Sequence, residues 1–132
     1  MNRSLPALLL LVSILLAPER PLAGGGTVVF GCNYTLSASI DGQDFSVSHQ
    51  DRVKSGSAIP FYFQDYLLQL RVTEASAEMA TIELILSEKS AGGWHQIYAS
   101  PPSFTVNLGV PTDFKHNDDV AEFDVSLIVS RL

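Results

Sequence analysis

The chain has 132 residues, of which 46% are hydrophobic, and a formal net charge of −6 at pH 7. This length suits one compact domain and is too short for two of ordinary size. The negative charge argues against binding to nucleic acid, and the apolar content argues against a disordered acidic tail. We therefore expect one folded, acidic domain whose partners do not include nucleic acid.

The N-terminal residues have the pattern of a secretory signal peptide. Arg3 supplies a positive charge, and residues 5–17 form an apolar run without a charged side chain. Residues 18–21 break this run, and Ala23 and Gly24 supply small side chains of the kind that signal peptidase accepts. We predict a signal peptide over residues 1–23, cleaved after Ala23 or, next best, Gly24. The single mature domain would then cover residues 24–132.

The apolar run near the N-terminus is short for a membrane span, because a transmembrane helix needs about 20 apolar residues. We therefore expect an exported protein with no stable membrane span once the signal peptide has been removed. An N-terminal anchor that is never cleaved is the alternative.

Cys32 is the single cysteine of the chain, so the domain has no internal disulfide. A free thiol in an exported protein has three possible roles. It can be a small buried core residue, it can react or pair with another chain, or it can carry a lipid. The sequence Val29-Phe30-Gly31-Cys32 is partly similar to the lipid-attachment motif of bacterial lipoproteins.

Residues 33–48 have the pattern of a β-hairpin. Apolar side chains alternate with polar ones from Tyr34 to Ile40, and again from Phe45 to Val47. Asp41-Gly42 between the two segments is a strong signal for a tight turn. The following polar segment, residues 51–57, is expected to be a loop or a short edge segment.

The middle of the chain predicts two long neighbouring strands. Residues 66–73 and 81–87 alternate with period two and are separated by a turn at residues 74–78. Before them, residues 59–63 form an aromatic run in which Pro60 favours an edge strand or a strand start.

The last third of the chain predicts further short strands. We expect strands at residues 94–99 and 104–108, a polar loop at residues 114–119, and a long C-terminal strand at residues 121–131. The segment Ser100–Phe114 has the rhythm Pro-x-x-Phe-x-Val-x-x-Gly-x-Pro-x-x-Phe. It resembles β-sandwich modules of bacterial envelope proteins, which implies a periplasmic location.

Seven to nine short strands with regularly spaced turns predict an all-β protein. The expected fold is an antiparallel β-sandwich, immunoglobulin-like in general architecture, in which each sheet has one apolar face. A small β-barrel is the alternative.

Aromatic side chains are the main candidates for recognition. Alternation buries only half of the run at residues 60–63, so Tyr62 is expected to face outward while Phe61 and Phe63 face the core. Exposed Tyr and Trp are favoured at protein interfaces. We predict a binding patch formed by Tyr62, Tyr66, Trp94 and Tyr98.

The polar segment 113–122 is a second candidate site. Grouped oxygen ligands suit Ca²⁺, and a histidine beside carboxylates suits a transition metal. The candidate ligands are His116, Asp118 and Asp119. The segment lacks the Asp-x-Asp-x-Asp-Gly pattern of a calcium loop, and an ordinary solvated loop accounts for the same residues.

Catalytic signatures are absent from the sequence. It contains no Gly-x-Ser-x-Gly elbow, no histidine pair at metal-ligand spacing and no phosphate-binding glycine loop before a helix. We therefore predict a protein that is not an enzyme and needs no cofactor.

These observations favour an exported, non-catalytic domain that binds another cell-envelope or secreted protein. The C-terminal strand could offer an edge to which a partner adds a strand. The alternative function is a small-ligand or metal-binding module that uses the 113–122 segment. Location in the periplasm is favoured, and secretion from the cell is the other possibility.

Overall fold

The computed structural model describes residues 27–132, so the predicted signal peptide and its cleavage site lie outside the described residues. In this part of the chain no helix is long and apolar enough to cross a membrane. The described residues fold into nine strands: β1 (Val29–Ile40), β2 (Gln43–Lys54), β3 (Ser57–Phe63), β4 (Tyr66–Ser76), β5 (Met79–Ser90), β6 (Gly93–Gln96), β7 (Ser103–Asn107), β8 (Thr112–Asn117) and β9 (Ala121–Arg131).

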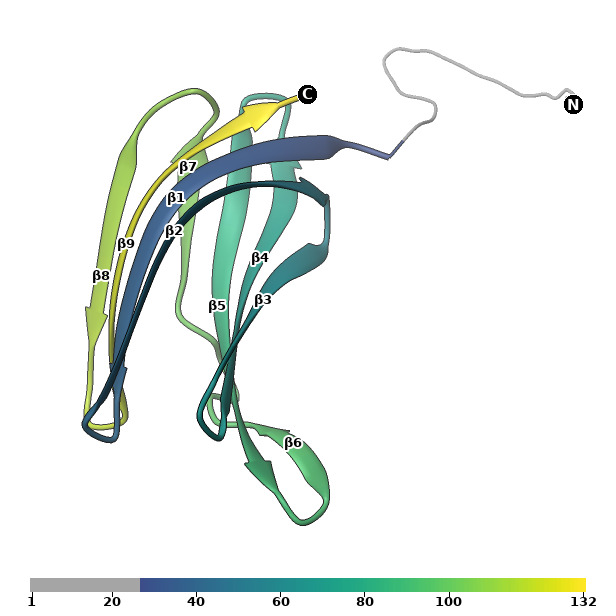
Figure 1. The fold of residues 1–132 in the computed structure, drawn as a ribbon. Helices are drawn as coiled ribbons and strands as arrows, with labels where there is room; N and C mark the ends of the chain where they lie inside the picture. Colours follow the sequence, from purple (N-terminus) through teal and green to yellow (C-terminus); the bar gives the residue numbers. More distant parts are fainter. Residues whose placement is uncertain (1–26) are drawn as a thin grey trace, which may run out of the picture.

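The strands form two antiparallel sheets that pack face to face (Figure 1). Sheet A has the order β2-β1-β9-β8. Sheet B has the order β3-β4-β5, and β6 and β7 pair one after the other with the remaining side of β5. Because both sheets end in open edges, the predicted β-sandwich is confirmed and the alternative of a closed barrel is wrong.

The core lies between the inner faces of the two sheets. Sheet A contributes the alternating side chains of its two central strands: every second residue of β1 from Phe30 to Ile40 and of β9 from Ala121 to Val129 is buried. In sheet B the inner side chains of β4 and β5 complete it, among them Leu68, Leu70 and Leu84. Full burial of one such leucine stabilises the fold by about 2 kcal/mol.

The predicted β1–β2 hairpin is confirmed, and its turn has the expected residues. Asp41 and Gly42 have φ angles of 51° and 75°. Two successive positive φ angles define the turn whose twist matches that of the flanking strands, and Asp-Gly is one of the sequences that adopts it. The register then runs unbroken from Ile40↔Gln43 to Val29↔Lys54.

The polar segment 114–119 is largely a strand, and the predicted loop there is wrong. β8 runs from Thr112 to Asn117 and pairs with β9 along its whole length. Thr112, Phe114 and His116 are half-buried, whereas the residues between them are exposed. Two of the three inward positions hold polar side chains, which hid the alternation in the sequence.

Two other boundaries and one strand position differ from the predictions. β2 continues to Lys54, so only residues 55–56 remain as the turn before β3. The strand predicted at residues 94–99 is β6 and ends at Gln96. The C-terminal strand β9 lies between β1 and β8, so the predicted free edge at this strand is wrong. β3, with Pro60, is an edge strand as expected.

Candidate functional site

The four aromatic residues predicted to form one patch are separated by the fold. Tyr62 and Trp94 lie on the outer face of sheet B, with exposed fractions of 66% and 41%. Tyr66 is buried on the inner face, where its ring lies 5.8 Å from that of Phe63. Tyr98 follows β6 and packs beside His116 of sheet A. The structure therefore brings together only Tyr62 and Trp94.

The Tyr62 and Trp94 rings meet on the outer face of sheet B, at the end where β3 turns into β4. Tyr62 belongs to β3 and Trp94 to β6, and β4 and β5 lie between these strands. Neighbouring strands are about 4.8 Å apart, so the two backbones are roughly 14 Å apart. The ring centroids are nevertheless only 5.9 Å apart. Both side chains must therefore lean inward over β4 and β5, and we call this pair the aromatic roof.

Beneath the aromatic roof lie side chains that the sequence analysis did not identify. Leu67 is directly opposite Tyr62 on β4, and Ser87 is directly opposite Leu67 on β5. Both are buried although they point away from the core, and so is Ile85, the next outward residue on β5. The sequence holds a signal for them: the unbroken apolar runs 66–68 and 84–86 indicate strands that are covered on both faces.

A second cluster joins the two sheets. Asp118, at the end of β8, accepts hydrogen bonds from the Tyr98 hydroxyl at 2.8 Å and from the N–H groups of Val120 and Ala121 at 2.8 and 3.0 Å. His116 Nε2 lies 2.7 Å from the same carboxylate. The cluster therefore holds the β8–β9 turn in shape and ties it to the segment after β6.

The hydrogen bonds of this cluster shift two pKa values. The bond from the Ala121 N–H, followed by the contact with His116, holds the pKa of Asp118 well below its usual range. Burial, followed by the hydrogen bond to Asp118, raises the pKa of Tyr98. Asp118 is therefore a carboxylate, and Tyr98 a neutral hydroxyl donor, at neutral pH.

The residues predicted as metal ligands are only partly together. His116 and Asp118 are in contact, but Asp119 is exposed in the turn and takes no part in these hydrogen bonds. Within residues 27–132, no group of three or more His, Cys, Asp or Glu side chains is arranged to hold a metal ion. Asp118 instead accepts hydrogen bonds from two backbone N–H groups and from the Tyr98 hydroxyl. The metal-binding alternative stays a prediction.

Cys32 lies on the inner face of β1 and is 1% exposed. Burial, with a smaller contribution from nearby Asp51, raises the pKa of its thiol to about 11. The thiol is therefore protonated at neutral pH, and it is a poor nucleophile because the thiolate is the reactive form. Its burial also shields it from reagents.

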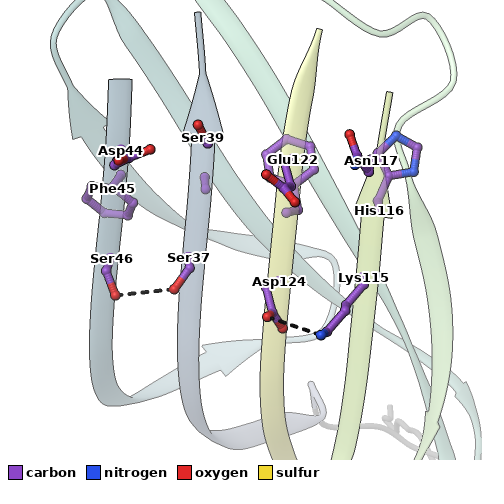
Figure 2. A pocket seen from close by; sticks show the side chains of 12 residues that line it. Ser37, Ser39, Asp44, Phe45, Ser46, Lys115, His116, Asn117, Glu122 and Asp124 are labelled. Carbon is purple, nitrogen blue, oxygen red and sulfur yellow. Dashed lines mark hydrogen bonds and ion pairs between the residues drawn. The ribbon is translucent and has the colours of Figure 1, made fainter. Parts of the chain in front are cut away.

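The outer face of sheet A carries a shallow groove of about 580 Å³ (Figure 2). Mostly polar side chains from all four strands line it, and two pairs of them meet across neighbouring strands. Ser37 and Ser46 form a hydroxyl–hydroxyl bond of 3.3 Å, and Lys115 lies 3.8 Å from Asp124. Asp44 and Glu122 line the same groove, so it is acidic overall.

No known protein family, curated protein or solved structure matches the chain. The aromatic roof exposes two aromatic side chains to solvent, whereas the Tyr98–Asp118–His116 cluster directs its polar groups to one another.

Proposed function

We propose that this chain is an exported, non-catalytic β-domain that binds another cell-envelope or secreted protein through the aromatic roof. The observation that carries the proposal is the exposure of the roof. Tyr62 is 66% exposed, more than any other large hydrophobic side chain of residues 27–132. Tyr and Trp are the residues that most often supply binding energy at protein interfaces.

The surroundings of the aromatic roof suit an interface with a protein. On the same outer face of sheet B, Leu67 and Ile85 are buried. Polar side chains lie beside the two rings: Gln96 is on the same cross-strand row as Tyr62, and Lys89 is directly opposite Trp94. An apolar centre with a polar rim is typical of binding hot spots. The partner is expected to present an apolar side chain or loop to the two rings.

The proposed location rests on the N-terminal sequence. The positively charged N-terminus, the apolar run and the small residues at the predicted cleavage site support export of the protein. The resemblance of residues 100–114 to β-sandwich modules of envelope proteins supports a periplasmic location.

The state of the Cys32 thiol supports a non-catalytic role. The Cys32 thiol is buried and protonated, so it is a poor nucleophile.

Retention of a partner from envelope extract would test the proposed function. The immobilised protein would be compared with Tyr62→Ser and with the control Ser126→Ala, which alters an exposed side chain on sheet A. We expect one discrete protein to be retained by the wild type and the control. Tyr62→Ser should retain about tenfold less, because truncating a hot-spot aromatic costs about 1.4 kcal/mol or more. Equal retention by Tyr62→Ser would contradict the proposal.

A further inference from the structure

β2 is the longest free edge among the described strands. Figure 1 shows β2 at the margin of sheet A, where it pairs with β1 alone. The other margins are shorter: β8 has 6 residues, β6 has 4, β7 has 5, and the 7-residue β3 contains Pro60. β2 has 12 residues, no proline and an unbroken register with β1. A long unpaired edge of this kind is a template for another strand.

The backbone groups that face the free edge can be identified. The Ser55 N–H donates to the Val28 carbonyl at 2.9 Å, which marks residue 55 as facing β1. In an antiparallel pair, such residues alternate with residues whose N–H and C=O point away. The even-numbered residues from Asp44 to Lys54 therefore direct their backbone groups to the free edge. Their side chains lie on the outer face of sheet A, since the odd-numbered Phe45, Val47 and Val53 face the core.

The charges along this edge are complementary to a second copy of the same edge. Asp44 lies near one end and Arg52 near the other, and both are exposed. Between them are Ser46, Ser48 and Gln50, which are uncharged. An antiparallel copy reverses the order of the charges, so each acidic end meets a basic end.

We propose that two copies of this chain associate by antiparallel pairing of β2 with β2 about a two-fold axis at Ser48. Asp44 of each copy then lies opposite Arg52 of the other, and Ser46 lies opposite Gln50. The five outward-facing residues 44–52 form roughly ten ladder hydrogen bonds, and the two four-stranded sheets become one continuous sheet.

The ends of the edge fix this register. A shift of two residues in one direction places Asp44 opposite the uncharged Gln50. A shift in the other direction brings Asp44 to Lys54, where the chain turns into β3 at residues 55–56. Arg52 itself is exposed, and a hollow of about 260 Å³ lies beside it between residues 51–54 and 57–60.

Proline at the two-fold axis tests the pairing. Ser48→Pro removes an N–H that points to the free edge and leaves the β1–β2 ladder intact, and proline is tolerated on edge strands. The matched control is Asp113→Pro on β8, the other edge of sheet A. Sedimentation over a wide concentration range is expected to show a monomer–dimer equilibrium for the wild type and the control, and only monomer for Ser48→Pro.

Charge reversal tests the register and does not depend on proline. Arg52→Asp and Asp44→Arg are each expected to be monomeric, because each places like charges opposite one another. The double variant D44R/R52D should regain the dimer, and a mixture of the two single variants should form a heterodimer. A wild type that stays monomeric at all concentrations would overturn the inference. So would a dimer that survives Ser48→Pro, or one that Tyr62→Ser abolishes.

Discussion

The outer faces of the two sheets differ although both belong to strands with alternating patterns. On sheet A most outward residues are hydroxyls, amides and charges, such as Thr35, Ser37 and Asp124, and the surface carries a shallow polar groove. On sheet B the outward Leu67 and Ile85 are buried, and Tyr62 and Trp94 meet on the same face. The difference teaches that departures from alternation, rather than the alternation itself, indicate where a β-sandwich carries a second apolar surface.

Truncating Leu67, which lies directly opposite Tyr62, should have the largest effect on stability. Leu67→Ala is expected to lower the free energy of unfolding by about 2–4 kcal/mol, because it leaves a cavity beneath Tyr62. Ser126→Ala on the outer face of sheet A should change it by less than about 0.5 kcal/mol. Urea unfolding of the three proteins measures both values. Similar, small changes for the two variants would show that Leu67 is not covered.

The contact between the two rings should be measurable as a coupling. A double-mutant cycle with Tyr62→Ser and Trp94→Ser is expected to give about 0.5–1.5 kcal/mol, the usual value for an aromatic pair. The comparable cycle on sheet A, Thr35→Ala with Ser48→Ala, removes an exposed hydroxyl contact of 2.8 Å and should give less than about 0.5 kcal/mol. Zero coupling between Tyr62 and Trp94 would mean that the rings do not meet in solution.

The Tyr98–Asp118 link should make stability depend on pH in the acid range. The native state favours the carboxylate, because the pKa of Asp118 is lowered. Its stabilising effect is therefore fully present above the ordinary carboxyl pKa of about 4 and is lost as the pH falls below it. Asp118→Asn should be less stable than the wild type at pH 7, and the two should converge in acid. A constant difference from neutral to acid pH would contradict this role.

Cys32 should give the smallest effect on native behaviour. Iodoacetamide at neutral pH is expected to leave the thiol unmodified in the native protein and to modify it rapidly in denaturant, because the side chain is 1% exposed and its pKa is about 11. Mass spectrometry measures the modification. Rapid native modification would show that β1 opens or that the thiol is accessible.

Much of the fold could be predicted from local sequence. The β1–β2 hairpin follows from alternation and Asp41-Gly42, and the pairing of β4 with β5 follows from two long alternating segments joined by a short turn. β8 was missed because polar Thr112 and His116 occupy inward positions. In that strand, burial is decided by tertiary neighbours such as Tyr98, which packs against His116.

The candidate site was predicted in part. Tyr62 was expected to face outward because Phe61 and Phe63 take the core side, and that orientation follows from alternation alone. The meeting of Tyr62 with Trp94 depends on the order of four strands, and the bond between Tyr98 and Asp118 joins residues 20 positions apart. Contacts of this kind are set by topology, which no local pattern encodes.

Site-specific photocrosslinking in intact cells would test the central claim most directly. A photoreactive residue at position 62 is predicted to capture one discrete partner protein, and the same residue at position 126 on sheet A is predicted to capture none. The position-62 adduct should disappear when Trp94 is replaced by Ser. No adduct at position 62, or equal adducts at both positions, would contradict the assignment of the aromatic roof as the binding surface.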